Sequence, residues 1–117
     1  MQRLKEISKK IAERKAKIRI SLKSLVDQLK NFGALKIYVF GSYNRDEIDV
    51  NSDLDLFVIM PSNKTGKEWI DFIYSNIERE VSSDIIVFNI DEFNDQLPSS
   101  SFLTNIIQSG SLIYEKT

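Results

Sequence analysis

Apolar residues recur at helical spacing along the N-terminal segment of the chain. Between residues 3 and 31 they fall three or four positions apart, which predicts one long amphipathic helix. The apolar positions are Leu4, Ile7, Ile11, Ile18, Leu22, Leu25, Val26 and Leu29. The stripe thins between Ile11 and Ile18, so we expect the second half of the helix to pack on the body, and the first half to project or meet another chain. Gly33 is expected to end the helix as a left-handed cap.

Beyond this helix, apolar runs alternate with further stretches of helical spacing. Four apolar runs predict strands, at residues 35–40, 53–60, 84–89 and 111–114. Helical spacing predicts two further helices, from residue 65 or 66 to about residue 80 and over residues 99–108.

The order of these elements predicts an α/β or α+β domain. We expect a small mixed β-sheet with helices packed on one face, in a single domain of residues 1–117. Residues 1–32 would form the basic amphipathic helix, and residues 35–114 the core that carries the chemistry. The link between the first two strands, residues 41–52, fits either a hairpin or a crossover.

Composition narrows the class of protein. Hydrophobic residues make up 42% of the chain and charged residues 28%, which is typical of a folded soluble domain. No apolar stretch approaches the roughly 20 residues that span a bilayer, so no membrane partner is expected. The chain lacks cysteine and a secretory signal, which favours a cytoplasmic location. It also lacks histidine, so metal ligands would be oxygens, which favours magnesium, manganese or calcium.

Charge is distributed unevenly along the chain. Residues 1–30 contain ten Lys or Arg against three acidic residues, a net charge of +7, whereas the remainder contains six against fourteen, a net charge of −8. One interpretation is a solvated helix face. The other is a helix that meets an anionic partner, either nucleic acid or an acidic protein surface.

Three aspartates are the strongest candidates for metal ligands. Asp53 and Asp55 are two residues apart in a predicted strand and therefore point to the same face, while Asp84 opens a later strand. Carboxylates on neighbouring strands repel one another unless a cation meets them. We expect Asp53 and Asp55 to bridge two divalent ions about 3.5–4 Å apart. Asp84 would complete the site and take a proton from an incoming hydroxyl.

A glycine turn upstream is a candidate phosphate site. Gly41 follows the first predicted strand and allows the backbone to approach a ligand closely. Backbone amides at the start of a helical turn favour anions, and the Ser42 hydroxyl adds a donor. Arg45 lies one turn later and can donate to a phosphate oxygen. Each feature alone is common in turns and on surfaces; their conjunction with the three aspartates is far more specific.

These motifs resemble a known family. Gly41-Ser42, ten further residues and Asp53-Leu54-Asp55 are similar to the signature of the DNA polymerase beta-like nucleotidyltransferase superfamily. Arg45-Asp46 resembles its Gly-Ser-x-x-Arg form, and Asp84 resembles its third carboxylate. The resemblance extends from about residue 35 to residue 114 and is closest to the minimal nucleotidyltransferases.

The resemblance implies a fold, a reaction and a partner. It implies the polymerase beta-like fold and transfer of AMP from ATP with two magnesium ions, or manganese in their place. The acceptor would be a hydroxyl, often of a tyrosine, on a HEPN-domain toxin for which the chain is the antitoxin. Catalysis and metal binding would rest on Asp53, Asp55 and Asp84, and nucleotide binding on Gly41, Ser42 and Arg45. The long basic helix departs from the smallest members of the family.

The sequence leaves open several alternatives for the acceptor, the function and the oligomeric state. No residues are left for an acceptor domain, so the acceptor would be a second protein, a free small molecule or a copy of this chain. The chain could neutralise a toxin by occlusion without catalysis, or modify small molecules as antibiotic-modifying enzymes do. Nucleic-acid binding would involve only the basic helix. A homo-oligomer and a hetero-oligomer both fit.

Overall fold

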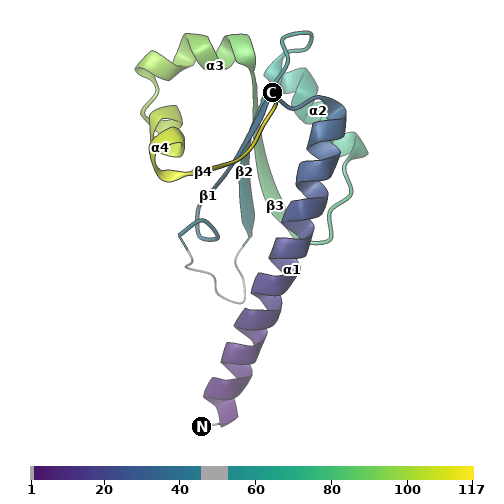
Figure 1. Cartoon of the computed structure of the whole chain (residues 1–117), viewed down its shortest axis with the longest axis vertical. Coiled ribbons are helices and arrows are strands. Elements are labelled where there is room, and N and C mark those ends of the chain that lie inside the picture. The colour runs from purple at the N-terminus through teal and green to yellow at the C-terminus, as the bar shows by residue number, and fades with distance from the viewer. Residues whose placement is uncertain (1, 46–52) are drawn as a thin grey trace.

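The computed structural model describes residues 2–45 and 53–117. The elements follow the order α1 (Gln2–Phe32), β1 (Lys36–Phe40), β2 (Leu54–Met60), α2 (Gly66–Asn76), β3 (Ser83–Asn89), α3 (Ile90–Gln96), the 3-10 turn η1 (Leu97–Ser99), α4 (Ser101–Ser109) and β4 (Ser111–Glu115) (Figure 1). The predicted mixture of helices and strands is confirmed. Asp46, part of the proposed motif, lies outside the described residues.

The four strands form one mixed sheet in the order β3-β2-β1-β4. β1 is antiparallel to both of its neighbours, so the link from β1 to β2 is hairpin-like. β2 and β3 are parallel, and α2 forms the crossover between them. The amino ends of β2 and β3 therefore lie at the same edge of the sheet.

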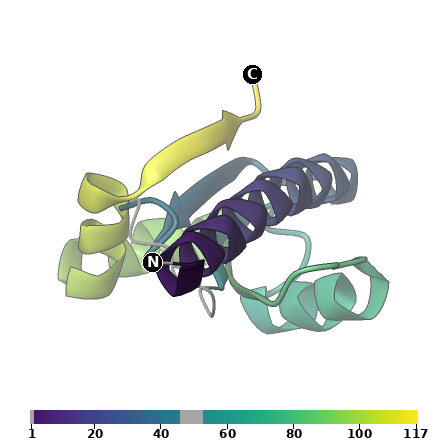
Figure 2. The ribbon, with the colours of Figure 1, turned by 90° about the horizontal axis from the view of Figure 1, so that it is seen from below.

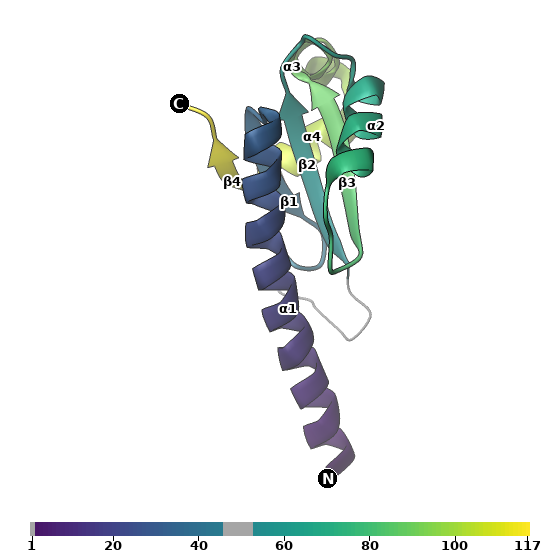
Figure 3. The same cartoon turned by 90° about the vertical axis from the view of Figure 1, so that its right-hand side faces the viewer.

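Helices cover both faces of this sheet. Alternate residues of β2, beginning with Leu54 and Leu56, pack in one cluster with side chains of α1 and α2. Phe57 and Ile59 pack in a second cluster with side chains of α3 and α4. Figure 3 shows α1 and α2 in front of the strands and α3 and α4 behind them. The expectation of helices on one face only was wrong, because the apolar run of β2 buries both of its sides.

α1 differs sharply between its two halves. Ile18 and Leu29 are fully buried, whereas Leu4 is 64% exposed and Ile7 is 44% exposed. The first half of the helix extends beyond the sheet (Figures 1 and 3) and lies toward the viewer in Figure 2, and the molecule is 54 Å long as a result. The predicted packing of the second half on the body is confirmed. Neither α1 nor any other helix in the described ranges is long and apolar enough to cross a membrane.

Gly33 ends α1 in the predicted conformation. Its φ of 107° lies in the left-handed region that favours glycine. The amides of Gly33 and Ala34 donate to the carbonyls of Lys30 and Leu29 at 3.0 Å each, which satisfies the last turn of the helix.

α2 ends four residues earlier than predicted, at Asn76. Ile77 leaves the helix with extended backbone angles. Gln28 of α1 then holds the next residue from both sides: its amide donates to the Glu78 carbonyl at 2.9 Å, and its Oε1 accepts from the Glu78 N–H at 2.8 Å. These tertiary hydrogen bonds draw the chain away from the helical path that its periodicity predicts.

Capping residues organise the carboxyl edge of the sheet, where β2 and β3 end. Asn89 caps α3 and forms a reciprocal capping box with Glu92. Glu92 Oε1 also accepts from the Gly66 amide at 3.0 Å, in addition to the Asn89 amide at 2.8 Å. One carboxylate therefore joins the starts of α2 and α3, which lie on opposite faces of the sheet.

Candidate functional site

The register of β2 and β3 places two of the predicted aspartates side by side. Asp55 is the direct partner of Asp84 in the parallel ladder. Both lie on the face that carries Phe57 and Ile86, because their strand neighbours Leu56 and Ile85 pack in the opposite cluster. Asp53 lies one residue before β2. All three aspartates therefore occupy the amino edge of the two parallel strands.

The charge of these carboxylates is not fully balanced. The pKa of Asp55 is raised above its ordinary value, first by burial and then by the negative charges of Asp84 and Asp53. Arg45 acts in the opposite direction. Asp53 and Asp84 are exposed, whereas Asp55 is half-buried. A cation at this edge would relieve the repulsion.

Gly41 packs directly against Asp55. It follows Phe40, the residue of β1 that is paired with Asp55. Its φ is 78°, and a Cβ built there would overlap Asp55 Oδ2 and lie 3.1 Å from Asp55 Cγ. Any side chain would therefore force the turn or the carboxylate to move. The glycine brings the turn and the aspartate together.

The turn after Gly41 is short and anchored at its far side. The Arg45 amide donates to the Gly41 carbonyl at 3.2 Å, which forms the predicted single helical turn. The Asn44 side chain donates to the Ser109 carbonyl at 2.8 Å and accepts from the Ser111 hydroxyl. A hollow of about 250 Å³ lies beside this contact and is lined by both the turn and α4; its lining includes Gly41, Asn44, Arg45, Asn105 and Ser109.

Ser42 is half-buried within this turn. Asn44 was missed by the sequence reasoning. Its hydrogen-bond partners are more than sixty residues away in the sequence. The only sequence signal for a role of Asn44 was its position in the turn that begins at Gly41.

Arg14 of α1 is a second residue that the sequence reasoning missed. Its Nη2 lies 3.6 Å from Asp53 Oδ1. The signal was present in the sequence: Arg14 occupies a body-facing position of the apolar stripe, between Ile11 and Ile18. Here the anionic group that meets this basic residue is the Asp53 carboxylate.

The donor set suits a divalent cation such as magnesium. Carboxylate oxygens are the ligands that magnesium and manganese prefer, and the register aligns two of them. As the side chains stand, no three carboxylates within residues 2–45 and 53–117 converge tightly enough to hold one ion. Asp53 pairs with Arg14. Joint ligation by Asp53, Asp55 and Asp84 therefore stays a prediction.

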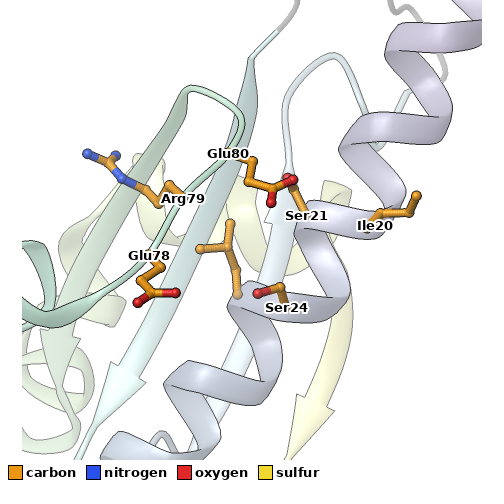
Figure 4. Close-up of a pocket in the computed structure, with 7 residues that line it drawn as sticks. Ile20, Ser21, Ser24, Glu78, Arg79 and Glu80 are labelled. Carbon is orange, nitrogen blue, oxygen red and sulfur yellow. The ribbon is translucent and has the colours of Figure 1, made fainter.

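A separate hollow between α1 and the link from α2 to β3 includes none of the predicted site residues. It measures about 120 Å³ (Figure 4). Glu78 and Glu80 extend toward α1 at its edge, whereas Arg79 points away. Arg79 donates to the Ser83 carbonyl at 2.9 Å and lies over the Tyr74 ring. This hollow is a gap in helix packing rather than part of the carboxylate site.

Comparison with known families assigns a nucleotidyltransferase-type domain to this mixed sheet, with its carboxylates at the amino edge of two parallel strands beside a glycine turn. The chain belongs to the family described as "Polymerase beta, Nucleotidyltransferase", which matches residues 22–117. All six predicted site residues lie within this match, and Arg14 lies outside it.

One solved structure supports the fold. A candidate nucleotidyltransferase from Sulfolobus solfataricus is 14% identical, with a TM-score of 0.65 over 92% of this chain and 88% of that chain. At this identity the likeness concerns the fold alone. Among curated proteins, none matches the sequence significantly.

Proposed function

We propose that the chain transfers AMP from ATP to a hydroxyl group of a partner protein. The pairing of Asp55 with Asp84 in the β2–β3 register, with Gly41 packed against Asp55, is the observation that carries this proposal. It brings the carboxylates and the glycine turn to one edge of the sheet, as metal-assisted phosphoryl transfer requires.

Each predicted residue has a role in this reaction. Asp53, Asp55 and Asp84 would hold two magnesium ions, or manganese in their place. When bound, such ions offset the charge of the triphosphate and favour ionisation of the acceptor hydroxyl. The backbone amides after Gly41 and the hydroxyl of Ser42 hold the phosphates, and Arg45 adds a positive charge nearby.

Asp84 is the proposed general base. It is exposed at the edge of the sheet, so an acceptor hydroxyl can reach it. The acceptor oxygen forms a bond to the α-phosphorus while the bond from that phosphorus to the α–β bridging oxygen breaks. Pyrophosphate leaves, and the acceptor proton goes to Asp84.

The proposed acceptor is a tyrosine of a HEPN-type toxin, with the chain as its cytoplasmic antitoxin. This choice rests on the resemblance to the minimal nucleotidyltransferases. The exposed Leu4 and Ile7 on the projecting half of α1 are consistent with a protein partner, because large apolar side chains repeated on one helix face commonly mark a docking surface.

The direct test mixes the chain with labelled ATP, magnesium and the candidate toxin. We expect label on the toxin and a mass increment of one or more AMP groups. Asp84→Asn should abolish transfer while nucleotide binding persists, because the amide cannot accept the proton. Normal turnover by this variant would show that the base is assigned wrongly. Absence of transfer by the wild type with every metal and nucleotide tried would contradict the proposal.

Neutralisation by occlusion is the second candidate function. The exposed apolar positions on α1 favour it, because they provide a surface for a partner without any chemistry. A double variant with Asp53→Ala and Asp55→Ala separates the two functions in cells that express the toxin. Full protection by this variant would favour occlusion, and loss of protection with binding intact would favour catalysis.

A further inference from the structure

Arg14 faces the body of the domain from the middle of α1. It follows Ile11 by three residues and precedes Ile18 by four, so these side chains share one face of the helix. Ile18 is fully buried, and Ile11 and Arg14 are half-buried, whereas the nearby Glu13 and Lys17 are exposed. Arg14 thus occupies a position where the pattern of the helix expects an apolar residue.

The ion pair with Asp53 adds too little to the stability of the fold to explain why an arginine occupies this position. The pair spans 3.6 Å, and 22% of the Arg14 side chain and 48% of the Asp53 side chain are exposed. Ion pairs this open to water add little to the stability of a fold. The same contact also places a positive charge 3.6 Å from Asp53, which changes the local charge of the site.

A positive charge on the side of Asp53 offsets part of the repulsion among the three aspartates. The three aspartates gather at one edge of the sheet, where Arg45 from the glycine turn provides one positive charge. Arg14 provides another from a different element. Residue 14 precedes residues 22–117, the part of the chain that matches the family.

We propose that Arg14 is a positioning residue: a tethered counter-ion of Asp53 that competes with divalent cations for this carboxylate. The inference rests on the proposed function in one respect, namely that the same carboxylates bind a divalent cation. Cation binding then requires the Arg14–Asp53 pair to open. By linkage, cation binding weakens the packing of the middle of α1 on the domain, and this packing weakens cation binding to the same extent.

Titration of the full chain with Mn²⁺ alone tests the competition. Arg14→Gln should bind Mn²⁺ about 3- to 5-fold more tightly than the control Lys17→Gln, a difference typical of losing one partly exposed ion pair. Lys17 is exposed on the same helix, so its variant corrects for the general loss of one positive charge. Arg14→Lys, which keeps the charge, should stay closer to the wild type.

Amide hydrogen exchange provides a second readout that needs no nucleotide. In the wild type, Mn²⁺ should speed exchange around residue 14 several-fold, because the pair opens. In Arg14→Gln, exchange there should be fast already and insensitive to Mn²⁺.

Equal Mn²⁺ affinities of Arg14→Gln and Lys17→Gln, or weaker binding by Arg14→Gln, would overturn the role of Arg14 and leave the proposed function standing. An absence of Mn²⁺ binding by every variant and by the wild type would overturn both.

Discussion

Acidic side chains at the two ends of the parallel pair β2–β3 have opposite surroundings. At the carboxyl end, Glu92 accepts hydrogen bonds from the amides of Gly66 and Asn89. At the amino end, Asp55 lies beside Asp84 and close to Asp53, and its pKa is raised by burial and by both of these charges. In the first arrangement, backbone amides donate hydrogen bonds to the carboxylate. In the second, neighbouring carboxylates repel one another.

This contrast distinguishes a carboxylate that stabilises the fold from carboxylates that are placed to bind a ligand. A carboxylate that accepts from two backbone amides fixes the positions of the elements that supply them. Carboxylates that repel one another cost stability, and such sites persist where a ligand benefits from the unbalanced charge. The sharpest tests therefore compare one residue at each end.

The largest expected effect is on catalysis at the amino end. Asp55→Asn should lower the rate of AMP transfer by about 1,000-fold, because the amide removes a negative ligand. Glu92→Gln, at the other end, should leave the rate of transfer within about threefold of the wild type, because the Gln oxygen can still accept from the amides of Gly66 and Asn89 and lies far from the aspartates. The labelled transfer assay measures the rates of both variants, and circular dichroism checks that they fold. Comparable losses for both variants would mean that the two ends do not differ in function.

The next effect concerns the glycine turn. Gly41→Ala should destabilise the domain by about 2–3 kcal/mol, since it adds an overlap with Asp55 to the strain of a positive φ. Gly33→Ala is the matched control, because φ is also positive there but the nearest atom lies 3.8 Å from the built Cβ. It should cost about 1–2 kcal/mol, from the strain of the positive φ alone. Urea unfolding measures both, and equal losses would show that contact with Asp55 is unimportant.

A third effect tests the carboxyl end by itself. Glu92→Ala should cost about 2 kcal/mol, because the amides of Gly66 and Asn89 lose their acceptor in a partly buried place. Glu68→Ala, in the exposed capping box of α2, should cost less, since water can replace its single bond to Thr65. Thermal unfolding compares the two variants. A larger loss for Glu68→Ala would contradict the role assigned to Glu92.

The smallest effect is on stability at the amino end. Because the pKa of Asp55 is raised in the folded state, the folded chain binds its proton more tightly, and stability falls as pH rises through the range above the ordinary pKa. Asp55→Asn removes this penalty and should raise the metal-free Tm at neutral pH by about 2 °C, because water screens a half-buried group. The gain should vanish at low pH. A lower Tm in Asp55→Asn would contradict this account.

The local features of the fold were predictable from sequence, whereas their spatial relations were not. The apolar runs predicted the strands. A shared face for Asp53 and Asp55 stays a prediction, because Asp53 lies before β2 and its side chain contacts Arg14 of α1. The pairing of Asp55 with Asp84 depends on register, which no local pattern fixes. The early end of α2 depends on Gln28, and the anchoring of the turn depends on Asn44; both act through hydrogen bonds between distant segments. Arg14 is intermediate, because its break in the stripe was visible but its partner was not.

The shared acceptor Glu92 also has a consequence for how the molecule comes apart. α2 and α3 cover opposite faces of the sheet, yet their first turns depend on the same oxygen atom. Fraying of either helix start removes a hydrogen bond that orients Glu92 for the other, which favours cooperative opening of the two layers. Partial opening of the molecule is thereby directed away from these helices and toward the projecting half of α1, which shares none of these bonds.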